Sequence, residues 1–196
     1  EVVGLGLTLD WFTHRPLFGR TVLVTRPIGQ ADDLDAILSE FVADVLVQPA
    51  IDIAPPKDII AVDRVIDRLS EFDWLVFSSA NGVRHFMDRL LIGGDLRRLG
   101  SIRIAAIGPG TAEALACFHL RIDVLPTVYR AEALAAVLSP LTMGKRVLLV
   151  RASRGREILA EMLSASGAAV EQVVAYQSTD VETPDPDIVA ILDSGQ

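Results

Sequence analysis

The sequence has a single cysteine, Cys117, among 196 residues. One cysteine excludes an intrachain disulfide and a metal site built from several thiolates, and it is typical of a reducing compartment. Histidine is scarce too: His14, His85 and His119 stand far apart, so no metal-ligand spacing and no histidine-based triad is visible. We therefore expect neither a metal nor a cofactor that needs one.

Long hydrophobic runs are also missing. No stretch reaches the roughly 18 uninterrupted apolar residues of a membrane span. The first residues carry acids and lack the basic start and apolar middle of a signal peptide. We expect a cytoplasmic protein with no membrane partner. The chain starts without Met and ends inside a helical pattern, so we interpret it as a piece of a longer polypeptide.

Positive charge is in deficit, with 18 Lys and Arg against 26 Asp and Glu and a net charge of −8. This balance argues against a nucleic-acid binder, which normally presents a basic face. A local group of arginines and helix N-termini can still attract an anionic small molecule. The 51% hydrophobic content predicts a well-buried core.

Apolar, strand-like runs alternate with helical patterns along the chain. The runs cover residues 21–27, 44–53, 74–79, 102–108, 122–126, 146–152 and 170–178. Helical spacing recurs between them, in one segment at Leu34, Ile37, Leu38 and Phe41, and in another at Ile158, Leu159, Met162 and Leu163, with Gly167 as its end. This alternation predicts the α/β class, with parallel strands and right-handed crossovers.

Two proline-rich stretches predict a division into lobes. We expect a linker from an upstream domain at residues 1–20, part of a first lobe at 21–50, a linker at 51–58, a second lobe at 59–177, and a linker with the return to the first lobe at 178–196. The result would be two flavodoxin-like parallel-sheet lobes, one inserted in the other. The first lobe would be incomplete here, because its partner strands would follow Gln196.

Three expected strands end in small or polar residues. These are Ser78, Ser79 and Asn81, then Gly108, Gly110 and Thr111, then Arg151, Ser153, Arg154 and Arg156. The carboxyl ends of parallel strands share one edge of a sheet, which is where ligands bind. Hydroxyls, helix N-termini and guanidinium groups there suit a ligand with several carboxylates or phosphates.

The same residues also have purely structural explanations. Ser79 and Thr111 fit as helix N-caps. One or two of the arginines fit as ion-pair partners of Glu157 or Glu161. Tyr176 fits as a core residue with its hydroxyl at the edge. Residue chemistry alone leaves these alternatives open.

Taken together, the motifs resemble the uroporphyrinogen-III synthase family. The matching stretches are VLVTRP, QPAIDIAPP, DWLVFSSANGV, IAAIGPGTAEAL, VYRAEALAAVL, KRVLLVRASRGREIL and VVAYQST, in family order over residues 21–179. Residues 9–27 are similar to the junction of bacterial fusions in which a uroporphyrin-III C-methyltransferase precedes the synthase. The resemblance implies two partners, which are the fused methyltransferase and an upstream hydroxymethylbilane synthase.

The resemblance implies an enzyme of tetrapyrrole biosynthesis. It would cyclise hydroxymethylbilane, a linear tetrapyrrole polycarboxylate, with loss of water and inversion of the terminal pyrrole ring, without cofactor or metal. Tyr176 would assist departure of the hydroxyl. The implied substrate-binding residues are Ser78, Ser79, Asn81, Gly108, Thr111, Arg26, Arg151 and Arg156.

Two positions depart from the family pattern. Val42 and His119 stand where glycine usually ends a helix in this family. A β-branched valine is poor in the left-handed conformation, so we expect the helix end at Val42 to be rearranged. These departures slightly favour an alternative function, a non-catalytic module that binds an anionic ligand.

Overall fold

The computed structural model describes residue 11 and residues 13–194. The chain forms two compact units, unit 1 from Glu1–Ile53 with Thr179–Gln196, and unit 2 from Ala54–Ser178. The predicted upstream linker at residues 1–20 therefore lies largely outside the described residues. No helix among the described residues has both the length and the apolar character to cross a bilayer.

Unit 1 contains a pair of parallel strands and two helices. Strand β1 (Thr21–Val24) pairs with β2 (Asp44–Val47), and α1 (Asp32–Glu40) connects them. The predicted helix is thus confirmed. Its apolar face is only partly covered, because Leu34 and Leu38 are partly buried while Ile37 is 52% exposed.

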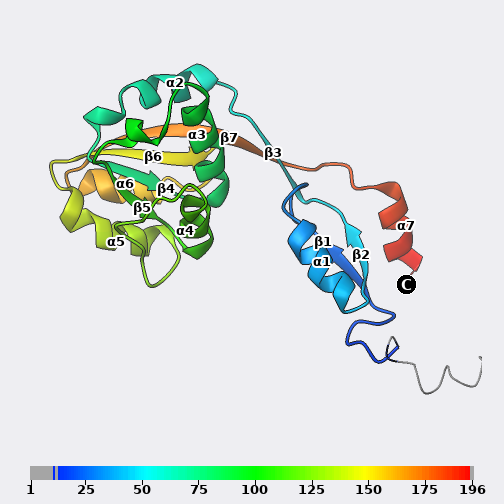
Figure 1. Ribbon diagram of the computed structural model, residues 1–196. Helices are drawn as coiled ribbons and strands as arrows, with labels where there is room; N and C mark the ends of the chain where they lie inside the picture. Colours follow the sequence, from blue (N-terminus) through cyan, green and yellow to red (C-terminus); the bar gives the residue numbers. More distant parts are fainter. Residues whose placement is uncertain (1–10, 12, 195–196) are drawn as a thin grey trace, which may run out of the picture. The chain divides into compact units, whose positions relative to one another are not determined.

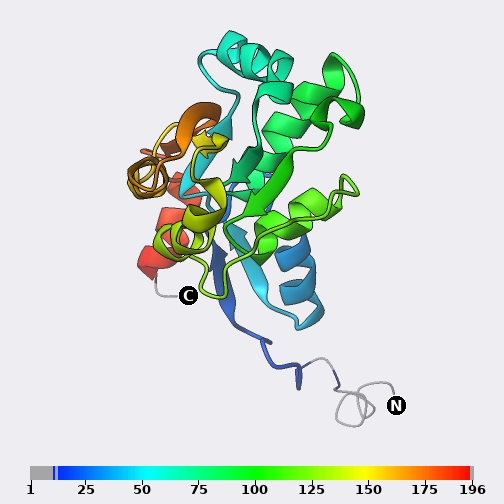
Figure 2. The same ribbon diagram turned by 90° about the vertical axis from the view of Figure 1, so that its left-hand side faces the viewer.

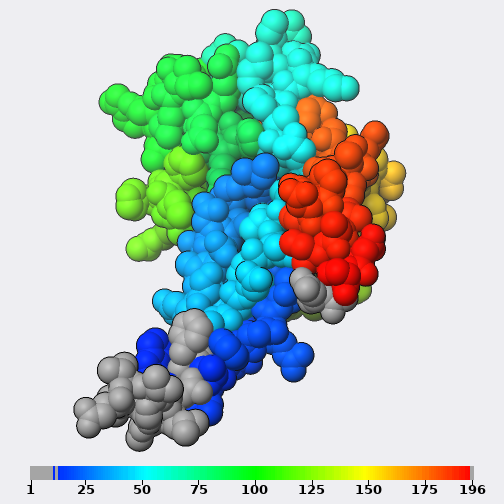
Figure 3. All heavy atoms as spheres, turned by 90° about the vertical axis from the view of Figure 1, so that its right-hand side faces the viewer, coloured from blue at the N-terminus to red at the C-terminus, as the bar shows by residue number. Residues whose placement is uncertain are grey.

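The chain returns to unit 1 through α7 (Pro186–Ser194). Figure 3 shows this segment, in red, against the cyan segment after β2. Two hydrogen bonds fix the return. The Val181 N–H donates to the Ala50 carbonyl at 3.1 Å, and the Asp185 N–H donates to Oε1 of Gln48 at 2.6 Å.

A five-stranded sheet has the order β3-β7-β6-β4-β5. Its strands are β3 (Ile51–Ala54), β4 (Trp74–Phe77), β5 (Arg103–Ala106), β6 (Arg146–Ala152) and β7 (Ala169–Asp180). Strand β4 runs parallel to β5 and β6, and β6 runs parallel to β7. The predicted α/β class with parallel strands is confirmed.

Helices lie on both faces of this sheet (Figure 1, Figure 2). They are α2 (Ile59–Asp67), α3 (Ala80–Ile92), α4 (Pro109–Ala116), α5 (Ala131–Thr142) and α6 (Ile158–Ala165), with short 3-10 turns at Leu69–Glu71 and Leu96–Leu99. Alternate strand residues face opposite sides. Trp74 and Val76 pack with Leu138 of α5 and Leu163 of α6. On α3, the ring of Phe86 meets Phe77 edge-on, with centroids 5.8 Å apart.

Two of the predicted strands differ from the observed ones. The run at residues 44–53 is split into β2 and β3, because Pro49 has no N–H to continue a ladder. The run at residues 122–126 is reduced to one bridge, between Val124 and Ala105. The other runs form strands at or within three residues of the predicted bounds.

The prediction of a rearranged helix end at Val42 is wrong. Val42 has a φ of 64°, in the left-handed region. Its N–H donates to the Ser39 carbonyl at 2.9 Å, and the Ala43 N–H donates to the Leu38 carbonyl at 3.1 Å. These are the two hydrogen bonds of a Schellman motif. They hold Val42 in a left-handed conformation that glycine would adopt without strain.

The other two ends of this kind make the same bonds. Gly167, predicted as a helix end, donates to the Ser164 carbonyl at 3.0 Å with a φ of 91°. His119 donates to the Ala116 carbonyl at 2.8 Å with a φ of 58°. The fold therefore imposes one end geometry on glycine, valine and histidine alike.

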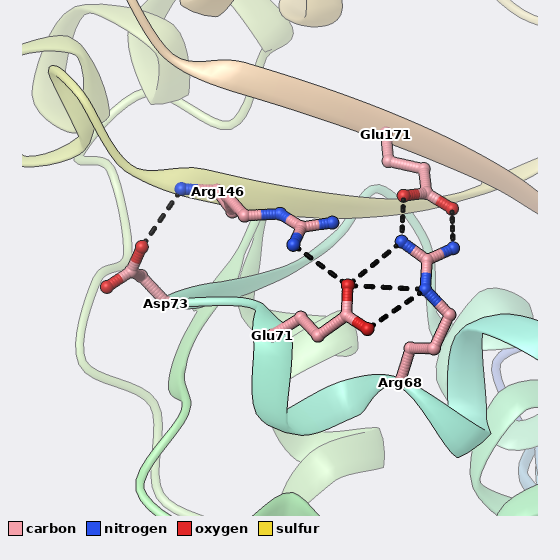
Figure 4. Close-up of polar contacts among 5 residues, drawn as sticks. All are labelled: Arg68, Glu71, Asp73, Arg146 and Glu171. Atoms are coloured by element: carbon pink, nitrogen blue, oxygen red, sulfur yellow. Dashed lines mark hydrogen bonds and ion pairs between the residues drawn. The ribbon is translucent and has the colours of Figure 1, made fainter.

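An ion-pair network ties the starts of three neighbouring segments together (Figure 4). Arg146, which begins β6, donates from its backbone N–H to Asp73 at 2.9 Å and from its guanidinium to Glu71 at 2.8 Å. Arg68 spans Glu71 at 3.1 Å and Glu171 of β7 at 3.3 Å. The hydrogen bonds from Arg68 and then Arg146 lower the pKa of Glu71.

Candidate functional site

The polar residues lie where the strands of unit 2 end. Phe77, the last residue of β4, pairs with Ala106 of β5 and Val150 of β6. Ser78 and Ser79 follow directly. Because these strands are parallel and in register, their carboxyl ends share one edge of the sheet. This edge is the candidate site.

Ser79 is the N-cap of α3. Its Oγ accepts the backbone N–H of Gly82 at 3.0 Å, so the capping role predicted as a structural explanation is confirmed. The same Oγ accepts the hydroxyl of Tyr176 at 3.1 Å. Two donors on one oxygen leave the serine's own O–H free to donate to a third group.

Tyr176 reaches Ser79 from β7, opposite Ala152 of β6. Its side chain is buried, with only 6% of the residue exposed. The interpretation as a core residue with its hydroxyl at the edge therefore fits the packing. The hydroxyl nevertheless points to the N-terminus of α3, which makes Tyr176 part of the candidate site.

His85 is a site neighbour that the sequence analysis missed. Its ring stacks on Tyr176, with centroids 5.6 Å apart and an interplanar angle of 14°. Burial lowers the pKa of His85, while the charge of Asp88 opposes that shift. The available signal was helical spacing, since His85 lies three residues after Gly82 and so shares its face of α3.

Ser78 and Asn81 have local partners. The Ser78 hydroxyl donates to the Val150 carbonyl at 3.2 Å, which ties the end of β4 to β6. The side-chain oxygen of Asn81 accepts a hydrogen bond from Arg84 one helical turn later at 3.2 Å. Both residues stand at the predicted edge, with Asn81 in the first turn of α3.

Gly108 rather than Thr111 is the N-cap of α4, which corrects the capping role suggested for Thr111. Pro109 takes the first helical position, where its fixed φ is favourable, so the helix starts earlier than a Thr111 cap would allow. Thr111 is buried at 5% exposure in the first turn. A Cβ on Gly108 would lie 3.3 Å from Cβ of Tyr129, so glycine permits this close approach.

Two of the predicted arginines are engaged in ion pairs. Arg151 pairs with Glu157, one of the two partners suggested by the sequence, and its guanidinium also donates to Gln172 at 3.0 Å. Its hydrogen bond is the largest cause of the lowered pKa of Glu157. Arg156 pairs with Glu132 on α5 at 2.9 Å, although 72% of its side chain stays exposed.

Arg26 belongs to unit 1, whereas the other predicted site residues belong to unit 2. It donates weakly to the Gln30 carbonyl at 3.4 Å. Within unit 2 the structure brings Ser79 and Tyr176 together, with Ser78 next to Ser79 in the chain.

A groove of about 700 Å³ lies in unit 2 beside α2 and β7. Lys57, Arg64, Ser153 and Gln177 are among its lining residues. Ser153, which directly follows β6, thus belongs both to the groove and to the predicted polar edge, whereas Ser78, Ser79 and Tyr176 do not line the groove. Among the described residues, no group of three or more His, Cys, Asp or Glu could hold a metal ion.

The fold and the site define a parallel α/β protein with hydroxyls and helix N-termini gathered at the carboxyl edge of its larger sheet. Residues 32–196 match the family described as uroporphyrinogen-III synthase HemD. The chain belongs to the uroporphyrinogen-III synthase family.

Curated relatives support this membership. The chain is 33% identical over 180 residues to the uroporphyrinogen-III synthase of Synechococcus elongatus, covering 91% of this chain and 68% of that protein. It is 27% identical to the porphyrin biosynthesis protein HemD of Ruminiclostridium josui, covering 91% of this chain and 36% of that protein. The chain thus spans about two thirds of the first protein and about a third of the second.

Solved structures support the fold. A crystal structure of a mutant uroporphyrinogen III synthase from Thermus thermophilus matches with a TM-score of 0.61 at 19% identity, over 90% of this chain and 68% of that one. The uroporphyrinogen-III synthetase of Helicobacter pylori matches with a TM-score of 0.52 at 18% identity, over 84% and 63%.

Proposed function

We propose that this chain is part of a uroporphyrinogen-III synthase, a hydro-lyase that cyclises hydroxymethylbilane to uroporphyrinogen III. The observation that carries the proposal is the family match over residues 32–196. The substrate would be a linear tetrapyrrole rich in carboxylates, with no metal or other cofactor. A cytoplasmic location, and functional links to an upstream hydroxymethylbilane synthase and a fused methyltransferase, belong to the same proposal.

In this reaction the C–O bond of the hydroxymethyl group breaks, and a proton must reach the departing oxygen so that it leaves as water. The carbon freed of its hydroxyl bonds to the terminal pyrrole and gives a spiro intermediate. Inversion of that pyrrole then breaks its old carbon–carbon bond and forms a new one at its other ring carbon, which loses a proton, so that the net change is the loss of water. Most of the enzyme's work is positioning a flexible chain. Hydrogen-bond donors near the departing hydroxyl add general-acid assistance.

The Tyr176–Ser79 pair suits that assistance. The Tyr176 hydroxyl donates to Ser79, and the free O–H of Ser79 can then donate to the departing oxygen or to a carboxylate. The N-termini of α3 and α4 offer backbone N–H groups and positive dipole ends for further carboxylates. Arg156, mostly exposed beside Glu132, and Arg26 are the proposed cationic contacts.

The alternative, a non-catalytic binding module, is slightly favoured in the sequence by the departures from the family pattern at Val42 and His119. Both ends keep the left-handed geometry that glycine would adopt. This removes the specific observation that favoured the alternative.

The test is a cyclisation assay on freshly made hydroxymethylbilane, with the product isomers separated after oxidation. Without a synthase the bilane closes to isomer I. We expect isomer III from the full-length protein that contains this chain, and heat-treated protein is the control. Isomer I alone from the folded full-length protein would overturn the proposal.

A further inference from the structure

Tyr176 is held at two places by two different residues. At its hydroxyl it donates to Ser79 at 3.1 Å. At its ring face it stacks on His85, with centroids 5.6 Å apart and an angle of 14°. Both partners come from one structural element, because Ser79 caps α3 and His85 lies in its second turn. Helix α3 therefore fixes the direction of the tyrosine side chain.

Close packing of α3 on the sheet makes this arrangement possible. A Cβ on Gly82 would lie 3.1 Å from Oγ of Ser79 and 3.6 Å from a methyl of Val150 on β6. Glycine thus lets the first turn of α3 approach β6 closely. His85, one turn further on the same face, can then reach across to Tyr176 on the neighbouring strand β7.

The environment of the His85 imidazole suits an uncharged ring stacked on Tyr176. His85 is half-buried, and desolvation lowers its pKa, against the opposing charge of Asp88. Burial therefore favours the uncharged form of the ring. A neutral aromatic ring in an offset stack restricts the tyrosine without pulling its hydroxyl away from Ser79.

We propose that His85 is a positioning residue for the cyclisation: its ring holds Tyr176 so that the tyrosine hydroxyl stays on Ser79. This inference rests on the proposed function. His85 touches Tyr176 and need not touch the substrate, so it acts through the tyrosine. Its removal should affect the rate of the chemical step more than the binding of the bilane.

Two substitutions separate stacking from other roles. His85→Ala removes the ring, and His85→Phe keeps a ring that can stack without nitrogen atoms. We expect His85→Ala to lower kcat for isomer III about fivefold with KM changed less than about twofold, from the size of a typical aromatic pair. His85→Phe should restore most of the lost kcat. Leu91→Ala, a 40% exposed position on the same helix, is the matched control and should keep the wild-type rate.

Nuclear magnetic resonance gives a readout that does not depend on turnover. The ring signal that disappears in ring-labelled Tyr176→Phe and persists in Tyr129→Phe is that of Tyr176. His85→Ala should shift this signal by removing the neighbouring ring current, and Leu91→Ala should not.

The outcomes are distinguishable. An unchanged kcat in folded His85→Ala, or a failure of folded His85→Phe to restore the rate, would overturn the positioning role. If unmodified full-length protein makes only isomer I, the proposed function itself fails. In that case an unshifted Tyr176 signal in His85→Ala would also refute the contact between the two rings. A shifted signal would confirm the contact, but His85 would not position Tyr176 for this reaction, so the inference would be overturned as well.

Discussion

The hydroxyl of Tyr176 donates to Oγ of Ser79 at 3.1 Å, although 97 residues separate the two in the chain. The bond connects β7 to the N-terminus of α3 at the carboxyl edge of the sheet. Ser79 meanwhile accepts the N–H of Gly82, so one serine oxygen both caps a helix and orients the tyrosine.

Removing the tyrosine hydroxyl should slow catalysis more than it weakens binding. We expect Tyr176→Phe to lower kcat for isomer III by about tenfold. This is less than the roughly 10²–10⁴-fold that a direct general acid supplies, because Tyr176 acts through the hydroxyl of Ser79. KM should change little, because a phenyl ring still fills the same site. Steady-state kinetics of isomer III formation measure both parameters. An unchanged kcat would remove Tyr176 from the mechanism.

Loss of Ser79 should destabilise the fold as well as the site. We expect Ser79→Ala to lower the free energy of unfolding by about 1 kcal/mol through the lost N-cap. Ser79→Asn, which can also cap, is the matched control and should retain most of that stability. Urea denaturation of both variants measures the difference.

The Tyr176–Ser79 bond can be measured separately by a double-mutant cycle. Tyr176→Phe, Ser79→Ala and the double variant should show a coupling free energy of about 0.5–1.5 kcal/mol, the net value of one hydrogen bond. Strictly additive effects on unfolding would show that the two groups are not coupled in solution.

The left-handed valine predicts a stabilising substitution. Val42→Gly should raise the free energy of unfolding by about 0.5–1 kcal/mol. Glycine removes the steric penalty of a side chain at a positive φ. Its greater conformational freedom in the unfolded chain offsets only part of this stabilisation. Gly167→Ala should have the opposite sign, because Gly167 has a φ of 91° in the same kind of helix end. If Val42→Gly is neutral or destabilising, the strain assigned to this position is wrong.

The ion-pair network around Glu71 predicts a pH effect on stability. Hydrogen bonds from Arg68 and Arg146 hold the pKa of Glu71 below its ordinary value of 4.5. The ionised carboxylate thus stabilises the folded state above that value, and the stabilisation is lost as the pH falls through the lower pKa of the folded state.

Glu71→Gln should therefore be less stable than wild type near neutral pH and lose less stability between pH about 6 and about 3. Urea unfolding at both pH values checks this. Glu113→Gln, an exposed glutamate on α4, is the control and should follow the wild-type pH dependence. Parallel pH profiles for wild type and Glu71→Gln would contradict the prediction.

Several elements could be predicted because their signals are local. The β6 run at residues 146–152 is a continuous apolar segment, and it forms a strand with those bounds. Gly167 ends α6 as its position after a helical pattern suggests. Ser79 caps α3 because a serine before a helical pattern supplies the acceptor that the first turn lacks. Such features depend on a few neighbouring residues, which the sequence displays directly.

Other features depended on contacts between distant segments. The stack of His85 on Tyr176 and the pairing of Arg156 with Glu132 join residues from different elements. Helical spacing places His85 on the same face of α3 as Gly82, but it does not identify Tyr176 as the partner. At Val42 a local signal led to a wrong prediction. The conformational preference of valine predicted a rearranged helix end, but two hydrogen bonds of that end hold Val42 in the left-handed conformation.

The sequence by itself determined the α/β alternation, the family and the gathering of hydroxyls and glycines at strand ends, because periodicity and motif order are properties of neighbouring residues. Only the tertiary structure decided which of those groups meet. It placed Tyr176 on Ser79 and His85 on Tyr176, and it paired Arg156 with Glu132. The physical reason is that parallel pairing brings the ends of distant strands to one edge, where the close approach of α3 at Gly82 selects the contacts.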